Sequence, residues 1–486
     1  MTESDFAVLP LSARRQERAR ELEQLLESTA SLARRLLADE DLPGDPDLRD
    51  PAQLARRLDL TLRNDGQPID AVLARLHEVL RATPSSSSWR FVNQLFGGRE
   101  PVATAAEMLA VVPNVSMYTL KAAGAQILVE RELLRHMATK AGFAGSDDSA
   151  GSAGSEGCFT PGGSSANLVA LLLARNAAAP ESRDQGMPGT KLVLYTSAEG
   201  HYSISKNAGI VGIGRLGVRK VPTDSAGRMD VGALARLLDE DRAQGFHPMQ
   251  INATAGTTVR GAFDPIRAIA ALARQHGVWL HVDGALGGSL VLCPARRDLV
   301  DGVELADSFS WDPHKMMGVP LQCSVLLVAR RGALTGSLDE TAEYLFQADD
   351  DDLNPGHRSI QCGRRNDALK LWAAWLRLGD RGWDERIQRQ LGLARLAASK
   401  IAADPAFELL EPPPSINVCF EVRGHASAAI CDWLDREGRL KIGYGTVRGR
   451  QAIRLVCVNP DLDETDLDAI LAEIKTAARA GGEVSS

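Results

Sequence analysis

Four groups of polar residues lie between apolar stretches of the chain, and their side chains or backbone N–H groups could bind ligands or react with them. In chain order they are the glycine–serine run at residues 162–165, His201, Asp283 and Lys315. Uncrowded backbone N–H groups at a helix start bind anions, an imidazole positions protons, a carboxylate binds cations, and a lysine amine can attack an aldehyde. These residue types predict a site that joins an anion cradle to a nucleophilic amine.

Lys315 lies in the segment SFSWDPHKMMG. An apolar run ends at Trp311, and Pro313 predicts a turn that presents His314 and Lys315 together. A lysine held in a packed, partly desolvated turn can act as an amine nucleophile toward an aldehyde. Taken alone, the residue could equally be a solvated surface lysine.

Asp283 closes the run VWLHVD, so its carboxylate is expected at the end of a buried strand. Burying a carboxylate without a partner is costly, and the residue therefore needs a cation. The protonated ring nitrogen of pyridoxal phosphate is such a cation, and the pairing lets the ring accept electrons from a substrate. A helix cap or a buried salt bridge is the alternative.

The run CFTPGGSSANLVALLLARN places two glycines and two serines before an apolar helix. We expect Gly163, Ser164 and Ser165 to hold the cofactor's phosphate at this helix start. A simple N-cap with a glycine turn is the alternative. His201 follows a strand and precedes a helix, where its ring could lie flat on the cofactor, although a lone histidine can also be purely structural.

The elements that must position these residues alternate between strand and helix. From about residue 158 to 328, short runs such as KLVLYT, MQINAT, VWLHVD and CSVLLVA are separated by helical segments such as IRAIAALARQHG. This alternation predicts an α/β fold with a mainly parallel sheet, in which ligands bind at the carboxyl ends of the strands. A small-residue run, GSDDSAGSAGSEG at residues 145–157, is predicted to be a loop.

Three domains are expected: an N-terminal helical segment (residues 1–96), a large domain (97–368) and a small C-terminal α+β domain (369–486). The leucines of residues 12–38 follow helical spacing on a charged segment. We expect this amphipathic arm to pack on another domain or another subunit, and a peripheral helix on its own chain is the alternative.

Composition narrows the class of protein. The 486 residues carry a net charge of -8 with no block of lysine and arginine, which argues against nucleic-acid or membrane partners. The seven cysteines are scattered without a CxxC pair, which indicates reduced thiols and no metal framework, as in a cytoplasmic protein. The first residues do not resemble a signal peptide, and no run of 18 apolar residues is present.

The order of these motifs resembles the group II pyridoxal-phosphate-dependent amino acid decarboxylases, on the aspartate-aminotransferase-like fold (fold type I). The likeness runs from about Phe91 to the C-terminus. It is carried by FVNQLFGG, NATAGTTVRGAFDP, HVDGALGG, DPHKMMGVPLQCS, YLFQ and IQCGRRND, and these segments are most similar to the glutamate and cysteine-sulfinate decarboxylase branch.

The resemblance implies a pyridoxal 5'-phosphate cofactor, an amino acid substrate and a homodimer with active sites at its interface. It implies that Lys315 is the Schiff-base lysine, Asp283 the partner of the ring nitrogen and His201 the stacking base. The other expected contacts are Ala285 against the ring, Thr258 and Asp264 along the pocket, Gly163, Ser164, Ser165 and His314 around the phosphate, and Gln94 and Arg454 on the substrate.

Several positions depart from the family pattern. The loop after YLFQ, ADDDDLNPGHRS, lacks the tyrosine that usually protonates the product, so His357 is a candidate substitute acid or only a solvated loop histidine. Asp312 stands where asparagine is usual, Lys121 and Gly124 replace glutamate and proline, and Gly284 replaces alanine. The aspartates at 349–352 would repel an anionic substrate, or simply form a solvated loop tip.

The predicted function is α-decarboxylation of an acidic L-amino acid (glutamate, aspartate or cysteine sulfinate) to an amine and carbon dioxide. One alternative keeps the chemistry on aromatic or other amino acids. Another is an aldehyde-forming oxidative deaminase, motivated by the missing tyrosine. The last is a cofactor-binding protein without catalysis.

Overall fold

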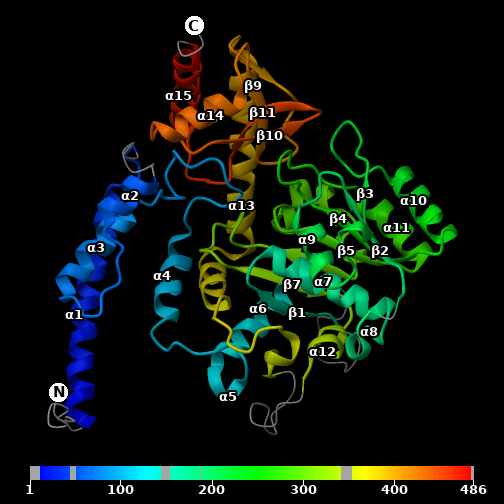
Figure 1. Ribbon diagram of the computed structural model, residues 1–486, viewed down its shortest axis with the longest axis horizontal. Coiled ribbons are helices and arrows are strands. Elements are labelled where there is room, and N and C mark those ends of the chain that lie inside the picture. The colour runs from blue at the N-terminus through cyan, green and yellow to red at the C-terminus, as the bar shows by residue number, and fades with distance from the viewer. Residues whose placement is uncertain (1–10, 44–50, 144–153, 188, 341–352, 483–486) are drawn as a thin grey trace.

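The computed structural model describes residues 11–43, 51–143, 154–187, 189–340 and 353–482. Its centre is a seven-stranded sheet in the order β1-β7-β6-β5-β4-β2-β3 (Figure 1). The strands are β1 (Glu156–Thr160), β2 (Leu192–Ser197), β3 (Val218–Val221), β4 (His247–Thr254), β5 (Trp279–Gly284), β6 (Ser308–Trp311) and β7 (Ser324–Val328). Strands β3, β2, β4, β5 and β6 pair in parallel, and β7 is antiparallel to both β6 and β1. The prediction of a mainly parallel sheet is confirmed.

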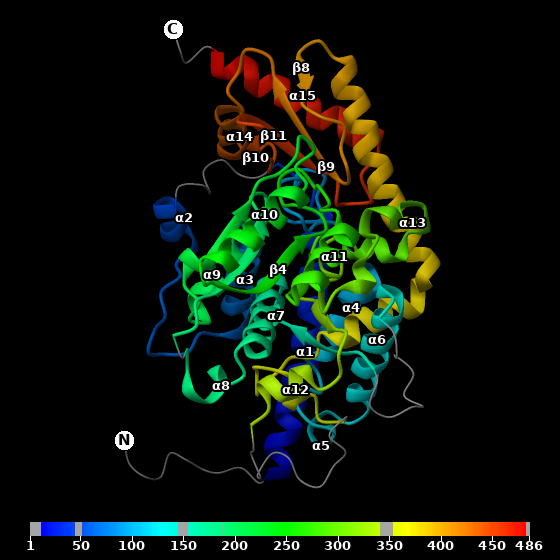
Figure 2. The same cartoon turned by 90° about the vertical axis from the view of Figure 1, so that its right-hand side faces the viewer.

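Helices cover both faces of this sheet (Figure 2). One face packs on α7 (Gly163–Ala178) and α9 (Ser203–Ile210), and the other packs on α10 (Val231–Ala243) and α11 (Ile266–His276). The large domain also contains α4 (Pro101–Ala110), α5 (Leu120–Ala123), α6 (Ala125–Ala141), α8 (Ser182–Gln185) and α12 (Ala333–Leu338). Nearly every residue of the central strands is buried, as expected for a parallel sheet that is covered on both faces.

The C-terminal part forms a second, antiparallel sheet in the order β10-β11-β9-β8. Its strands are β8 (Phe407–Leu409), β9 (Asn417–Val422), β10 (Gly443–Val447) and β11 (Arg450–Val456), with helices α14 (Ser427–Arg436) and α15 (Glu464–Gly482). Helix α13 (Ala368–Ala403) joins the two sheets and is kinked at Gly379, whose φ of 61° is left-handed. The expected boundary between residues 368 and 369 falls at the first turn of α13.

Three N-terminal helices, α1 (Leu11–Ala38), α2 (Pro51–Leu58) and α3 (Ile69–Arg81), form a column at one side of the molecule (Figure 1). The segment that follows is tied to the small sheet. The N–H of Val92 donates to the carbonyl of Lys441 at 2.9 Å, and the N–H of Val456 donates to the carbonyl of Val92 at 3.0 Å. This strand-like docking fixes the backbone just before Gln94.

The prediction of a loop over residues 145–157 is wrong at its C-terminal end. Residues 145–153 lie outside the described part of the chain, but Glu156 and Gly157 already belong to β1. A Cβ at Gly157 would lie 2.9 Å from the carbonyl oxygen of Leu326 on β7. The glycine is therefore needed for close strand packing, although its surroundings in the sequence are typical of a flexible loop.

Among the described residues, none of the helices has the length and the apolar character needed to span a membrane. No cluster of three or more histidine, cysteine, aspartate or glutamate side chains there could hold a metal ion. All seven cysteines are free thiols, and only Cys362 is exposed.

Candidate active site

The candidate site lies where β5 ends, at the carboxyl edge of the large sheet. Asp283 is only 5% exposed there. Its Oδ2 accepts a hydrogen bond of 2.8 Å from the Asn167 amide, and its Oδ1 accepts one of 3.1 Å from the backbone N–H of Ala285. The hydroxyl of Ser310 lies 3.4 Å from the same Oδ1. The strand-end carboxylate expected from the sequence is thus buried and held from several sides.

The Asp283 carboxyl stays ionised despite its burial. Burial raises its pKa, but the positive charge of Lys315, the neighbouring His281 and the Asn167 hydrogen bond outweigh that effect and hold the pKa below its usual value. A buried carboxylate of this kind is a strong partner for a cation in the adjoining pocket.

Lys315 sits in a tight turn after β6. Its N–H donates to the carbonyl of Asp312 at 2.9 Å, and its side chain is 20% exposed. The Oδ2 atom of Asp312 lies 3.5 Å from Nζ of Lys315 and also 3.5 Å from Nε2 of His314. The turn therefore presents His314 and Lys315 together, as the proline-containing segment predicted.

The start of α7 has the form of an anion cradle. Its N-cap is Gly162, at φ 100°, and no side chain caps the first turn. A Cβ at Gly163 would lie 2.7 Å from Oδ2 of Asp312 and 3.1 Å from Cβ of Ala285. Only glycine fits at this position, and because Gly162 is itself the N-cap, a phosphate-binding role and a simple N-cap with a glycine turn are both compatible with this helix start.

His201 follows β2 and lies near Asp283, whose negative charge partly offsets the effect of burial on the imidazole. The net result is a His201 pKa below its usual value, because burial is the larger effect. The backbone N–H of Ser203 donates to Nδ1 of His201 at 3.3 Å, and the Ser203 hydroxyl lies 2.8 Å from the same atom. Nδ1 is therefore an acceptor, and the proton of the neutral ring is on Nε2.

Asn167 is a site residue that the sequence reasoning missed. It lies in α7, 2% exposed, and its amide contacts Asp283, Ser203 and the ring of His281. The only signal in the sequence is an asparagine in the otherwise apolar run ANLVALLLA. A fully buried amide is costly unless it is hydrogen-bonded, so such a residue is a candidate for a specific role.

The residues expected on the substrate side converge from three distant segments. Arg454 on β11 donates to the backbone carbonyls of Thr258, at 2.7 Å, and of Asn93. Its Nε is buried without a hydrogen-bond partner among the described residues. Gln94, next to Asn93, is exposed. Arg454 therefore joins the segments that carry Thr258 and Gln94, and its buried Nε has no partner among the described residues.

Two expected site residues are engaged elsewhere in the chain. Asp264 is 3% exposed, and its carboxylate accepts backbone hydrogen bonds from Met229 at 2.6 Å and Thr254 at 2.8 Å. His357 pairs through Nδ1 with Asp339. These contacts give both residues a structural role, and the pocket-lining role of Asp264 and the catalytic role of His357 stay predictions.

The departures Gly284 and Gly124 have local structural reasons. A Cβ at Gly284 would lie 2.3 Å from Cε2 of Phe309 and 2.8 Å from the carbonyl oxygen of Ser310, so the usual alanine does not fit against this neighbour. Gly124 has a φ of 56° between α5 and α6, a conformation that proline cannot adopt. Lys121 lies in α5, and nothing in the structure explains its replacement of glutamate.

The residues present fit pyridoxal phosphate. The ionised Asp283 suits a protonated ring nitrogen, the Nε2-protonated His201 offers a flat ring, and Lys315 offers an amine to the aldehyde. The start of α7 carries no side-chain cap, and Gly163 lets its backbone lie close to Asp312 and Ala285, so the uncapped N–H groups there suit a phosphate. All of these groups come from the carboxyl ends of the strands and the turns that follow them.

Comparison with known proteins agrees with this geometry. Residues 51–423 match the pyridoxal-dependent decarboxylase conserved domain. Cysteine sulfinic acid decarboxylase of Homo sapiens is 38% identical over 452 residues, which cover 88% of this chain and 90% of that protein. Acidic amino acid decarboxylase GADL1 of Bos taurus is 36% identical over 449 residues, covering 88% and 84%.

Solved structures show the same likeness. The crystal structure of mouse CSAD aligns with a TM-score of 0.87 at 34% identity, covering 95% of this chain and 99% of that one. The predicted fold class, the pyridoxal phosphate cofactor and the enzyme class are thereby confirmed. This chain belongs to the family of pyridoxal-dependent decarboxylases.

Proposed function

We propose that this enzyme removes the α-carboxyl group of an acidic amino acid, giving an amine and carbon dioxide. The observation that carries the proposal is the meeting of Lys315, His201 and an ionised, buried Asp283 at one strand edge, with Arg454 joining the segments of Gln94 and Thr258 nearby. The two relatives named above act on cysteine sulfinic acid and on acidic amino acids, which supports an anionic substrate.

Each residue has a distinct part in this proposal. Pyridoxal phosphate, when bound, supplies the ring that accepts the electron pair left as the carboxyl group departs. Lys315 holds the cofactor's aldehyde, and Asp283 keeps the ring nitrogen protonated. His201 packs on the ring, while Gly163 and the following serines hold the phosphate. The Arg454 guanidinium, which keeps N–H groups beyond the two that bind the carbonyls of Thr258 and Asn93, donates to a carboxylate of the substrate, a charge-assisted contact that an arginine makes well.

Protonation of the product carbon is the step with the least defined donor. His357 is proposed for it, because it lies in the same loop that lacks the family's tyrosine. The aspartates of that loop lie outside the described residues. If His357 protonates slowly, molecular oxygen accepts the electrons in a share of turnovers, which then give aldehyde, ammonia, carbon dioxide and one hydrogen peroxide; this oxidative deamination is the second candidate function for this site.

A substrate screen tests the proposal directly. Purified holoenzyme is offered each common amino acid and cysteine sulfinate, and amine, carbon dioxide, oxygen uptake and peroxide are measured. We expect the highest kcat/KM with an acidic substrate and one carbon dioxide per amine. Lys315→Ala should lose both the visible absorbance and the borohydride-fixed adduct. A preference for aromatic amino acids would overturn the substrate assignment.

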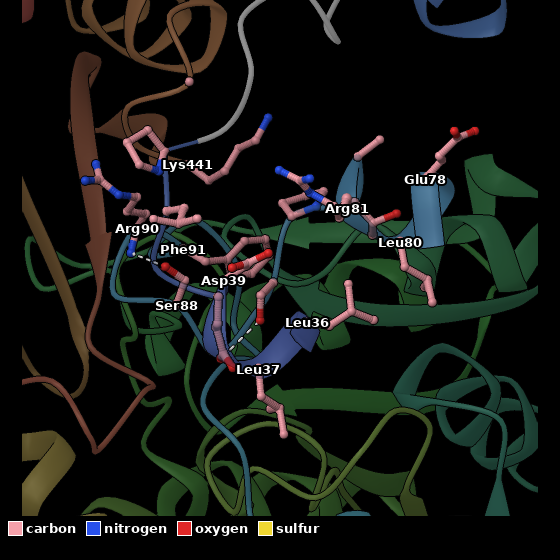
Figure 3. A pocket seen from close by; sticks show the side chains of 18 of the residues that line it. Leu36, Leu37, Asp39, Glu78, Leu80, Arg81, Ser88, Arg90, Phe91 and Lys441 are labelled. Atoms are coloured by element: carbon pink, nitrogen blue, oxygen red, sulfur yellow. Dashed lines mark hydrogen bonds between the residues drawn. The ribbon is translucent and has the colours of Figure 1, made fainter. Parts of the chain in front are cut away.

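We further propose that the enzyme is a homodimer. The arm helices and α4 expose a large apolar surface made by Leu22, Leu26, Leu37, Ile69, Leu76, Leu80, Met108 and Leu109. A groove of about 840 Å³ separates the arm from the body, with leucines of α1 and α3 on one side and Arg90, Phe91 and Lys441 on the other (Figure 3). An apolar surface of this extent is typical of a subunit interface.

The mass of the protein in solution tests the proposed homodimer. Light scattering should give twice the chain mass, and Leu76→Asp should shift the mass toward a single chain.

We also propose a cytoplasmic location, supported by seven free thiols of which six are buried. The location of a tagged full-length chain in its own cell tests this proposal, and an exported protein would contradict it.

A further inference from the structure

One face of the large sheet carries a layer of buried polar side chains under the candidate site. The register pairs Asn252 with His281 and Thr254 with Asp283 between β4 and β5, and it pairs His281 with Ser308 between β5 and β6. All of these side chains are at most 5% exposed. Because polar groups are costly in a protein interior, so many on one face indicate a specific use.

The hydrogen bonds of this layer run in one direction. The indole N–H of Trp279 can only donate, and it donates to the hydroxyl oxygen of Ser308 at 2.9 Å. The Ser308 hydroxyl is then free to donate to Nδ1 of His281, also at 2.9 Å. With Nδ1 accepting, the one proton of a neutral His281 must be on Nε2.

The chain continues from His281 to the site. Nε2 of His281 lies 2.9 Å from Oδ1 of Asn167, so the imidazole N–H donates to the amide oxygen. This contact fixes the orientation of the amide, and its NH₂ group must face Asp283, to which it donates at 2.8 Å. Burial lowers the pKa of His281, which keeps the ring neutral with a single N–H.

A branch of the same chain reaches His201. The Asn167 amide also donates to the Ser203 hydroxyl oxygen at 3.2 Å, and that hydroxyl lies 2.8 Å from Nδ1 of His201. The Ser203 hydroxyl therefore donates to His201 and reinforces the tautomer with its proton on Nε2. Asn167 thus connects the two residues that would contact the cofactor ring.

We propose that Asn167 and His281 are positioning residues, which through this directional chain keep Asp283 a pure hydrogen-bond acceptor toward the cofactor's ring nitrogen. The inference rests on the proposed role of Asp283. Reversal of the amide would place its oxygen against the carboxylate and would leave the Nε2–H of His281 facing an NH₂ group. Two oxygens 2.8 Å apart with no proton between them would repel each other, so the orientation with the NH₂ group toward Asp283 is favoured and sets Asp283 as an acceptor before any cofactor binds.

Three variants test the chain. Asn167→Asp keeps the size of the side chain but puts a second carboxylate beside Asp283, so that the pair shares a proton and Asp283 loses its pure acceptor character. His281→Phe removes the donor to Asn167, and His281→Gln restores one. Asn252→Ala is the matched control, because Asn252 is also buried and adjoins His281 but its amide points to Thr196 at 3.4 Å, away from Asp283.

The readouts separate positioning from folding. The dissociation constant of pyridoxal phosphate and the pH midpoint of the bound cofactor's visible absorbance are measured by titration, together with the Tm of each apoprotein. We expect Asn167→Asp and His281→Phe to raise the dissociation constant about 10-fold or more, to shift the midpoint, and to lower kcat with little change in KM. His281→Gln should recover most of both losses.

Several outcomes would overturn the inference. One is an Asn167→Asp protein whose dissociation constant and midpoint equal those of the unsubstituted enzyme. Another is an Asn252→Ala control that changes both as strongly, which would show that any cavity in the layer has the same effect. An unsubstituted protein that takes up no cofactor would refute the proposed function as well, so the two failures are distinguishable.

Discussion

Replacement of Arg454 by glutamine tests whether this guanidinium binds a substrate carboxylate. The arginine donates to the carbonyls of Thr258 and Asn93, and its Nε has no partner among the described residues. Loss of a hydrogen bond between charged groups costs about 1.5–3 kcal/mol, so we expect kcat/KM for the preferred acidic substrate to fall about 10- to 150-fold. Most of the change should appear in KM if the contact is equally strong in the bound substrate and in the transition state.

A second variant controls for the loss of structure. Asn417 donates to the carbonyls of Thr258 and Val259, both at 3.0 Å, and so holds the same segment without carrying a charge. Asn417→Ala should lower the free energy of unfolding by about 1–3 kcal/mol while changing kcat/KM no more than about threefold. Equal losses of kcat/KM in the two variants would refute the reasoning, since docking of the segment alone would then explain both. An unchanged kcat/KM in Arg454→Gln would do so too.

Three other predictions follow from single residues. Gly284→Ala should lower the free energy of unfolding by about 1–3 kcal/mol, because the new Cβ meets the Phe309 ring. Adding Phe309→Leu should restore part of this loss. Chemical denaturation of the single and the double variant measures the two free energies. Burial raises the Asp264 pKa from 3.8 to about 7, so the folded state holds a proton that the unfolded chain has lost. The free energy of unfolding should therefore fall, by at most about 4 kcal/mol, as pH rises from about 4 to about 7, and Asp264→Asn should flatten that slope in urea titrations across this range. If His357 is the proton donor, His357→Phe should raise the ratio of aldehyde to amine about 10-fold. Product analysis under air measures this ratio. An unchanged ratio would exclude His357 as the donor.

The sequence predicts those parts of the site that depend on local pattern. Asp283 ends a strand and Lys315 follows a proline turn, and both features are visible in runs of fewer than about ten residues. Parallel strands bring their carboxyl ends to one edge, so residues far apart in the sequence could be expected to meet. The antiparallel direction of β7 could not be predicted, because the run CSVLLVA has the same apolar character in either direction.

The residues that support the site were beyond local pattern. Asn167 and His281 are single polar residues inside apolar runs, and each would be costly to bury without a partner. Their partners lie on β6, α9 and the end of β5, and only the packing of α7 across the sheet brings them together. The local reason for Gly284 was equally hidden, because the Phe309 ring comes from the adjoining strand β6, where Phe309 pairs with Val282 and Gly284 pairs with Trp311.

The unusual Asp312 bears on how the phosphate would be held. Its Oδ1 accepts from the Ser324 hydroxyl at 2.5 Å, and its Oδ2 lies 3.5 Å from both His314 and Lys315. An ionised carboxylate can accept hydrogen bonds but cannot donate one to a phosphate oxygen, as the usual asparagine could. The phosphate would therefore depend on the free N–H groups at the start of α7 and on the hydroxyls of Ser164 and Ser165. Asp312 would instead stabilise the turn that carries His314 and Lys315, because one of its oxygens binds Ser324 and the other lies near both residues of the turn.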